Sequence, residues 1–321
     1  IIFKCTMSDL QFTIEVLLAT YNGEPFIREQ LNSLMNQSFA DFKIVIRDDG
    51  STDNTLNIIY EYQQKFPAKI SILKDNKKNV GATQNFGILL QQSTADYVFF
   101  CDQDDVWLPH KIEVSLQKMK VLEQNNKAIP CFVFSDMKSI DEAGNIIADS
   151  VWQQLHLHPK YFTLNRLLVQ NIPHGCTMLI NKAMRNLASP IPKEAMLHDH
   201  WIALLAATCG KFDSINEPTL LLRNHTKNVT RKPSSVLQKI KRFSTNFLSK
   251  DEYEYYIKIR VEQAKALQLR ASSFISDEHF DVLKQFIKLE KTKGLARKKI
   301  FLQHQFYRTT PWHTFKMILR S

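Results

Sequence analysis

The first hundred residues alternate short apolar runs rich in β-forming residues with longer segments whose apolar residues recur at helical spacing. The apolar runs predict strands at Thr13–Ala19, Phe42–Arg47, Ile70–Leu73 and Tyr97–Cys101. The segments between them predict helices at Pro25–Met35, Thr55–Phe66 and Thr83–Gln92. Such alternation predicts a parallel sheet with helices on both faces, and ligands of these sheets bind beyond the carboxyl ends of the strands.

The apolar pattern changes character at about residue 230. Before that point we expect helices at Pro109–Leu122 and Asp199–Ala207, and strands at Cys131–Phe134, Gly175–Ile180, Lys211–Ile215 and Thr219–Leu222. After it the pattern is wholly helical, with helices expected at Ser234–Leu248, Glu252–Ser273, Asp277–Lys291 and Leu295–Phe306. The sequence therefore predicts an α/β domain over residues 10–230 and a helical region over residues 231–321.

The charge divides the chain near the same place. From Arg223 to Ser321 there are 22 Lys and Arg against 8 Asp and Glu, a formal charge of +14, whereas the preceding residues carry 20 against 24. Helices with solvated basic faces explain this tail, and so does a surface for anionic lipids, since apolar residues interleave with basic ones from Val236 to Leu248. Nucleic acid is not expected as a partner because no nucleic-acid motif accompanies the charge.

The expected location is the cytoplasm, with peripheral contact at the inner face of the cell membrane as the alternative that the tail leaves open. The five cysteines are widely spaced and form no CxxC pair, which is typical of small buried side chains in a reducing compartment. No stretch reaches the roughly 18 apolar residues of a membrane span. The first ten residues lack the charged and apolar regions of a signal peptide.

Polar clusters follow three of the predicted strands. They are ATYNG at residues 19–23, DDGSTD at residues 48–53 and DQDD at residues 102–105. The first two are also ordinary turn sequences. Three carboxylates within four residues repel one another at neutral pH, and a divalent cation relieves that repulsion. The DQDD segment therefore predicts a site for Mg²⁺ or Mn²⁺, which prefer oxygen ligands.

A fourth cluster, HDHW at residues 198–201, opens an apolar helix. Its Asp199 can accept the proton of an attacking hydroxyl group, although an N-cap with aromatic packing explains the same residues. Nothing in the chain resembles a Ser-His-Asp triad or a zinc site.

The order of VLLATYNGEPFIREQLNSLMNQSFADFKIVIRDDGSTDNT, CDQDDVWLPHKIE and HDHW strongly resembles family 2 glycosyltransferases of the GT-A fold. The match covers about residues 15–228. It is most similar to bacterial rhamnosyltransferases, in which DQDDVW and HDxW occur together with QN-x-x-x-G, here Gln170 to Gly175. The resemblance implies an α/β nucleotide-diphospho-sugar transferase fold, Rossmann-like with a mostly parallel central sheet flanked by helices, followed by a C-terminal helical appendage.

The resemblance also implies roles for individual residues. Donor binding falls to Thr20, Tyr21, Asn22, Asp49, Gln84, Asn85, Asp102, Gln103, Gly175, His198 and Trp201. The metal ligands are Asp104 in first place, with Asp102, Asp105 and His225, and the ion is Mn²⁺ or Mg²⁺. Asp199 is the implied general base. Gln84-Asn85 departs from the Arg-Asn of many relatives, so the contact with the donor there is uncharged and the nucleotide stays open.

The implied activity is inverting transfer of a sugar, with L-rhamnose from dTDP-rhamnose favoured, to a hydroxyl of a glycan or polyprenyl-linked glycan in cell-surface polysaccharide biosynthesis. A UDP-hexose or UDP-N-acetylhexosamine donor is the alternative within the same class. Outside it, a nucleotide- or polyanion-binding protein without turnover fits the phosphate-binding features alone. Such a protein has no need of a base, so the presence of Asp199 favours the enzyme.

Overall fold

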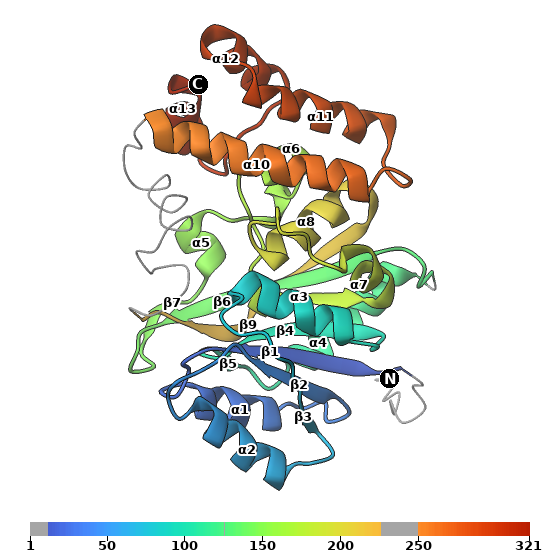
Figure 1. Ribbon diagram of the computed structural model, residues 1–321, viewed down its shortest axis with the longest axis vertical. Coiled ribbons are helices and arrows are strands. Elements are labelled where there is room, and N and C mark those ends of the chain that lie inside the picture. Colours follow the sequence, from blue (N-terminus) through green and yellow to red (C-terminus); the bar gives the residue numbers. More distant parts are fainter. Residues whose placement is uncertain (1–11, 125, 226–249) are drawn as a thin grey trace, which may run out of the picture.

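The computed structural model describes residues 12–124, 126–225 and 250–321 (Figure 1). Its centre is one sheet with the strand order β3-β2-β1-β4-β8-β6-β9-β5, in which β7 also pairs with β6. The strands are β1 (Ile14–Thr20), β2 (Lys43–Asp48), β3 (Ile70–Ile72), β4 (Tyr97–Asp102), β5 (Val106–Trp107), β6 (Cys131–Ile140), β7 (Ile146–Ala148), β8 (Leu179–Asn181) and β9 (Lys211–Arg223).

The sheet is mixed, with a parallel half built from the first hundred residues. Strands β3, β2, β1 and β4 pair in parallel, as do β6 and β9. Strand β8 is antiparallel to both β4 and β6, and β5 and β7 pair antiparallel with β9 and β6. Because β1, β2 and β4 end at the same edge, the polar clusters that follow them meet there.

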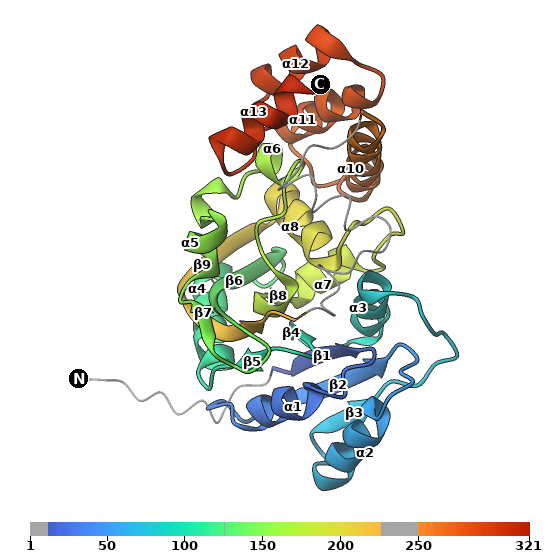
Figure 2. The ribbon, with the colours of Figure 1, turned by 90° about the vertical axis from the view of Figure 1, so that its left-hand side faces the viewer.

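Helices cover both faces of this sheet. They are α1 (Ile27–Met35), α2 (Thr55–Lys65), α3 (Ala82–Gln92), α4 (Lys111–Glu123), α5 (Val151–Leu155), α6 (Leu164–Leu167), α7 (Lys182–Ala188) and α8 (His198–Cys209). Figure 2 shows α1 and α2 on one side of the sheet and α3 and α8 on the other. In β1, Val16 and Leu18 pack in the core beneath α1, α2 and α4, whereas Leu17 packs in the core shared with α3 and α8. This alternation explains the apolar runs, since a strand covered on both faces buries every side chain.

The C-terminal helices α10 (Lys250–Arg270), α11 (Asp277–Ile287), α12 (Gly294–Gln303) and α13 (Pro311–Leu319) lie beyond α8 at one end of the molecule (Figures 1 and 2). Tyr256, Phe286 and Met317 of this region are fully buried in the same core as Leu205 of α8. No helix in the described part of the chain is long and apolar enough to cross a membrane. The expected domain boundary near residue 230 and the expected helix Ser234–Leu248 lie outside the described residues.

Most predicted elements are confirmed, but two predictions are wrong. Gly175–Thr177 forms a short 3₁₀ helix instead of starting a strand, because its backbone turns back to bond His174 and strand β8 begins only at Leu179. The two strands predicted between residues 211 and 222 are the single strand β9. Its pairing with β6 shifts register around Pro218, which has no N–H for the ladder. Helix α13 was not predicted; its residues Trp312, Phe315 and Leu319 face solvent, and Met317 is the one buried in the core.

Candidate active site

The DQDD loop (residues 102–105) joins β4 to β5 at the carboxyl edge of the sheet, and it meets the end of β9. Asp104 Oδ2 lies 2.7 Å from Nε2 of His225, whose ring packs against Phe26 at 4.5 Å between centroids. Asp105 is 1% exposed, and its Oδ1 accepts a hydrogen bond of 3.2 Å from the backbone N–H of Arg223. Residues 118 or more positions apart in the sequence thus form one site.

Arg223 fixes the DQDD loop from behind. Its side chain is buried, and Nε donates to the backbone carbonyl of Asp104 at 3.2 Å. Nη2 donates to Oε2 of Glu29 at 2.6 Å, and Nη1 donates to the carbonyl of Glu142 at 3.0 Å. A guanidinium group with several donors in a rigid plane suits this task. Arg223 therefore holds the loop, α1 and the β6–β7 turn in one arrangement.

The carboxylates of the DQDD loop fit a divalent cation. Oxygen atoms of Asp102 and Asp105 and the sulfur of Cys176 all lie within 4.8 Å of one another. Burial, followed by the charges of Asp104 and Asp199, raises the pKa of Asp102 to about 7. Burial, followed by the charges of Asp104 and Asp102, raises the pKa of Asp105 well above its usual range. A bound cation relieves this crowding of negative charge, and carboxylate oxygens are the ligands that Mg²⁺ and Mn²⁺ prefer.

Cys176 and Lys111 lie on the inner side of this cluster. Burial raises the pKa of the Cys176 thiol well above its usual range, so the group is neutral and hydrogen-bonds to Asp105. Nζ of Lys111 donates to the carbonyl of Cys176 at 2.9 Å and to the hydroxyl of Thr219 at 3.2 Å. Burial lowers the pKa of Lys111 to about 8. A neutral thiol is a poor ligand for a hard cation, so oxygen atoms of the DQDD loop form the better ligand set.

Asp199 lies in the first turn of α8, opposite the DQDD loop. Its Oδ2 accepts a hydrogen bond of 3.0 Å from the backbone N–H of Gly175, and Oδ1 accepts one of 2.6 Å from that of His200. The side chain of Asn171 also donates to this carboxylate. Burial nevertheless raises the pKa of Asp199 to about 6. The charge of Asp199 is one of those that raise the pKa of Asp102, so the predicted base and the predicted metal site face each other.

His198 and Gly175 pack closely beside this base. The His198 ring lies 4.1 Å from that of Phe86 and 5.1 Å from that of Phe100 between centroids. Burial lowers its pKa to about 3, and neither ring nitrogen has a hydrogen-bond partner among the described residues. A Cβ atom added to Gly175 would lie 2.4 Å from Nε2 of His198. Glycine is therefore required at position 175 for this approach.

The loops after β1 and β4 are joined through Gln103 and Tyr21. Oε1 of Gln103 accepts from the backbone N–H of Tyr21 at 2.8 Å, and Nε2 donates to the Tyr21 carbonyl at 3.0 Å. The Tyr21 side chain is 42% exposed, and its predicted contact with the donor stays a prediction. Asn22, with φ of 49°, accepts from the backbone N–H of Thr52 at 2.8 Å and so ties in the loop after β2.

Several other predicted donor-binding residues use their polar groups inside the protein. Nη1 of Arg47 donates to both Asp49 and Asn85 at 3.1 Å. Asp49 also accepts from the backbone N–H groups of residues 80 and 81, and the Thr20 hydroxyl donates to Asp48. Gln84 lies at hydrogen-bond distance, 3.5 Å, from the Pro192 carbonyl. Contacts of these residues with a donor stay a prediction.

Trp201 lies deepest of the predicted site residues. Its side chain is fully buried, and the indole N–H donates to the carbonyl of Ala188 at 3.1 Å. Its neighbour His200 is equally enclosed and bonds to the carbonyl of Leu167. In this structure Trp201 anchors α8 and presents no surface to a ligand.

Sequence reasoning missed Arg223, Cys176 and Asn171 as parts of this site. Arg223 directly precedes the Asn-His pair after β9, and Cys176 directly follows the glycine of QN-x-x-x-G. Asn171 belongs to that motif itself. The motif was visible in the sequence, but its contact with Asp199 depends on a turn that was predicted as a strand.

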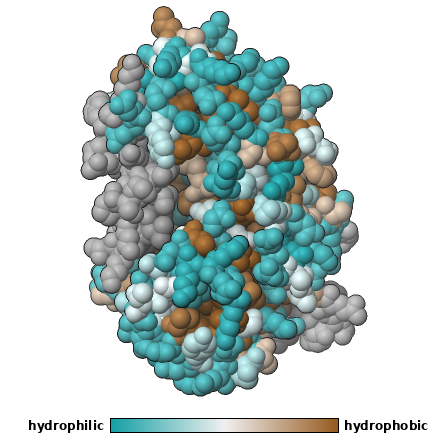
Figure 3. Space-filling model, in the orientation of Figure 1, coloured by the Kyte–Doolittle hydropathy of each residue, from teal (hydrophilic) through white to brown (hydrophobic). Residues whose placement is uncertain are grey.

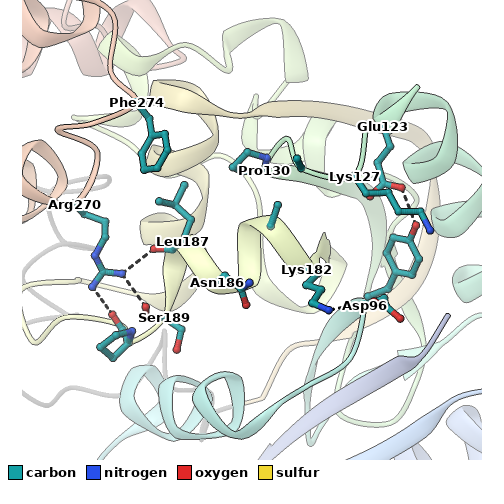
Figure 4. A pocket seen from close by; sticks show the side chains of 14 residues that line it. Asp96, Glu123, Lys127, Pro130, Lys182, Asn186, Leu187, Ser189, Arg270 and Phe274 are labelled. Atoms are coloured by element: carbon teal, nitrogen blue, oxygen red, sulfur yellow. Dashed lines mark hydrogen bonds and ion pairs between the residues drawn. The ribbon is translucent and has the colours of Figure 1, made fainter. Parts of the chain in front are cut away.

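A separate cavity of about 860 Å³ opens at the opposite edge of the sheet, where β4 and β6 begin (Figure 4). Its walls are mostly apolar, and its polar side chains bond within the protein. Arg270 donates to the backbone carbonyls of Leu187, Ser189 and Pro190, and Glu123 accepts from the Tyr97 hydroxyl at 2.7 Å. Tyr97 begins β4 whereas Asp102 ends it, so this cavity is not part of the candidate active site.

Comparison with known proteins identifies the family. The family model described as glycosyl transferase family 2 matches residues 15–187. The dTDP-rhamnosyl transferase RfbG of Shigella flexneri is 34% identical over 242 residues, which are 70% of this chain and 77% of RfbG. The poly(ribitol-phosphate) beta-N-acetylglucosaminyltransferase TarS of Staphylococcus aureus is 35% identical over 135 residues, which are 38% of this chain and 23% of TarS.

Solved structures agree on the fold. Residues 1–349 of TarS in complex with UDP-GlcNAc match with a TM-score of 0.57 at 16% identity, over 96% of this chain and 89% of that one. The mannosyltransferase PcManGT from Pyrobaculum calidifontis, solved with GDP-Man and Mn²⁺, matches with a TM-score of 0.54 at 12% identity, over 97% and 87%. The sheet with an acidic loop at its carboxyl edge is therefore a GT-A fold, as the motifs predicted. The chain belongs to glycosyl transferase family 2.

Proposed function

We propose that this chain is a metal-dependent, inverting glycosyltransferase that moves a sugar from a nucleotide diphosphate to an acceptor hydroxyl. The observation that carries the proposal is the position of Asp199, a buried carboxylate with a pKa of about 6 whose charge acts on Asp102. Asp199 bonds to the backbone of Gly175, and the next residue, Cys176, lies with Asp102 and Asp105 in one cluster. A base and a cation site on facing elements suit a reaction in which a proton leaves the acceptor while charge develops on a leaving diphosphate.

In this mechanism the carboxylate of Asp199 takes the proton of the acceptor hydroxyl. At the same time the acceptor's own hydroxyl oxygen attacks the anomeric carbon. The bond from the anomeric carbon to the diphosphate oxygen breaks, and its electron pair leaves with the nucleotide diphosphate. One displacement inverts the anomeric centre. The N–H of Gly175 and the amide of Asn171 hold the Asp199 carboxylate in place through this step.

The residues that would hold Mn²⁺ or Mg²⁺ are Asp104, Asp102, Asp105 and His225. The ion, when bound, would supply the positive charge that stabilises the leaving diphosphate. The DQDD loop itself positions these groups, since Asp104 is fixed from both sides. His225 contacts its carboxylate and Arg223 its backbone carbonyl. The use of Mn²⁺ by PcManGT, a protein of the same fold, supports this assignment.

The favoured donor is dTDP-rhamnose, because the likeness to RfbG extends over 70% of this chain. The proposed acceptor is a glycan or a polyprenyl-linked glycan in cell-surface polysaccharide biosynthesis, reached from the cytoplasm. A UDP-hexose or UDP-N-acetylhexosamine is the second candidate donor, which the likeness to TarS favours. The uncharged Gln84, half-buried in the first turn of α3, leaves either nucleotide open.

Release of nucleotide diphosphate from dTDP-rhamnose, UDP-glucose and UDP-N-acetylglucosamine in the presence of Mn²⁺ tests the proposal. We expect dTDP-rhamnose to be consumed fastest, in slow hydrolysis without an acceptor and faster when glycan oligosaccharides are supplied as acceptors. Faster consumption of a UDP-sugar would select the second candidate donor. Consumption of none of the three under any metal condition would contradict the transferase activity.

The acid limb of the rate profile reports the protonation of Asp199. Only its ionised form accepts a proton, so at saturating Mn²⁺ we expect kcat to rise about tenfold per pH unit below about pH 6 and to level off above it. Asn171→Leu removes a hydrogen bond that lowers this pKa, so its limb should lie at higher pH. A flat profile between about pH 5 and 8 with chemistry rate-limiting would be incompatible with Asp199 as the base.

A further inference from the structure

Helix α13 presents an apolar stripe to solvent. Trp312, Phe315 and Leu319 are 60%, 54% and 59% exposed. Their spacing of three and four residues places them on one face of the helix. The rings of Trp312 and Phe315 stack at 5.9 Å between centroids. Large apolar side chains gathered on one exposed face of a short helix are unusual on a soluble surface and mark a contact surface.

The opposite face of α13 fixes this orientation. Met317 is fully buried, and the Oγ of Ser321 lies 2.8 Å from the Tyr253 hydroxyl of α10. The helix begins at a Thr310 cap, whose hydroxyl accepts from the N–H of His313, and Pro311 occupies its first turn. The outward direction of the stripe is therefore set by packing and capping.

Helix α12 adds further apolar and basic residues at the same end of the molecule. Leu295 and Leu302, seven residues apart on one face, are 84% and 53% exposed, with the exposed Lys299 between them. Lys316 of α13 lies over the Trp312 ring at 4.8 Å. In Figure 3 this upper end shows brown side chains among teal ones. We use the name α12–α13 face for the apolar residues Trp312, Phe315, Leu319, Leu295 and Leu302 together with Lys299 and Lys316.

The positive charge of this region favours an anionic partner. The last 31 residues, from Lys291 to Ser321, contain 8 Lys and Arg and not one Asp or Glu. A second copy of the same face would bring like charges together, which disfavours self-association. An apolar stripe with Trp and Phe, flanked by Lys and Arg, suits the interface of a bilayer that contains anionic lipids.

We propose that the α12–α13 face docks on an anionic membrane surface, with Trp312, Phe315 and Leu319 inserted at the level of the headgroups. The expectation of membrane contact drawn from Val236 to Leu248 lies outside the described residues, so this face is an independent basis for it. The proposal does not depend on the donor or on the transfer reaction.

Gln170 connects the segment before α13 to the candidate active site. Its Oε1 accepts from the N–H of Thr309 at 3.0 Å and from Nε of Arg308 at 3.3 Å, directly before α13. The next residue, Asn171, donates to Asp199. The first residue of QN-x-x-x-G thus ties the membrane-docking segment to the loop that holds the proposed base. Such a tie suits an acceptor that is itself anchored in the bilayer.

The protein carries its own reporter for the test. Of the four tryptophans, Trp107, Trp152 and Trp201 are at most 7% exposed, so only the fluorescence of Trp312 senses its surroundings directly. Vesicles of equal parts phosphatidylcholine and phosphatidylglycerol should shift the emission to shorter wavelength, and brominated lipids should quench it. Vesicles of phosphatidylcholine alone should do neither at low salt. No shift with anionic vesicles, or an equal shift with both, would overturn the proposal.

Flotation with the same vesicles tests whether the lipid binds at this face or at another surface of the chain. We expect Trp312→Ser with Phe315→Ser to weaken vesicle binding by at least about tenfold. The matched control Val121→Ser changes an apolar residue of α4 that is 66% exposed, and it should bind as wild type does. Undiminished flotation of a double variant with an unchanged Tm would assign binding to another surface and refute the proposal. Dimerisation without vesicles that the double variant abolishes would refute it in favour of a second copy.

Discussion

Asp199→Asn is expected to reduce sugar transfer by roughly 10²- to 10⁴-fold while donor affinity stays within a few-fold of wild type. Asparagine has nearly the shape of aspartate, and its carbonyl oxygen still accepts one of the hydrogen bonds from Gly175 and His200. Its amide group cannot take up a proton at neutral pH. The loss therefore falls on kcat and spares binding.

The comparison needs single-turnover rates and donor titrations on the same preparations. Asp149→Asn is a suitable control, because that carboxylate is 80% exposed and pairs with Lys138 at the surface, next to β7. It should leave both quantities unchanged. Wild-type transfer by Asp199→Asn would remove the base assignment, and so would loss of donor binding by a variant that keeps its Tm.

Asp104→Asn is expected to weaken metal-dependent donor binding by at least about 100-fold and to reduce transfer in proportion. The substitution replaces a charged oxygen ligand with a neutral amide beside His225 and Asp102, which disfavours a divalent cation. Donor affinity measured with chelator present should change little, since that binding does not use the cation. Asp149→Asn again serves as the control.

The metal assignment of Asp104 rests on this contrast between the two conditions. An equal loss of donor affinity with and without metal would indicate that the site has collapsed. The Tm of the variant checks for such a collapse. Retention of Mn²⁺-dependent affinity by a folded variant would contradict the assignment and leave Asp102 and Asp105 as the ligands to test next.

The parallel half of the sheet was predictable because its strands are covered on both faces. The strands β1, β2 and β4 contain the apolar runs VLLA, IVI and YVFFC, and the polar cluster after each run lies at the shared carboxyl edge. The DQDD loop and Asp199 were therefore found from their positions directly after a strand and at the start of a helix. Their approach to each other was implied only by family resemblance.

The supports of the site could not be predicted, because they depend on pairings across the chain. Arg223 joins Glu29 to the DQDD loop across a separation of 194 residues, and no local pattern sets that register. Strand β9 was divided in two at Pro218, because the sequence does not reveal the bulge that tolerates proline. Cys176 appeared only as an apolar residue, although it lies beside the carboxylates of Asp102 and Asp105.

The basic tail shows what a charge count leaves out. Arg297, Lys298 and Lys299 form one basic run in the sequence, yet Arg297 is fully buried and bonds with both oxygens of Glu254 at 2.7 and 2.9 Å. Its neighbour Lys299 is exposed. Composition gave the excess of positive charge, but only packing tells which cations are available to a partner.

Calorimetric titration of dTDP-rhamnose into the wild-type protein, with Mn²⁺ and with chelator, tests the metal-dependent donor site most directly. We expect saturable binding with Mn²⁺ that weakens by at least about tenfold when the metal is removed. Affinity that is the same with Mn²⁺ and with chelator would contradict a metal-dependent site in the DQDD loop. Absence of binding by dTDP-rhamnose and by the two UDP-sugars with Mn²⁺ present would contradict the nucleotide-sugar site altogether.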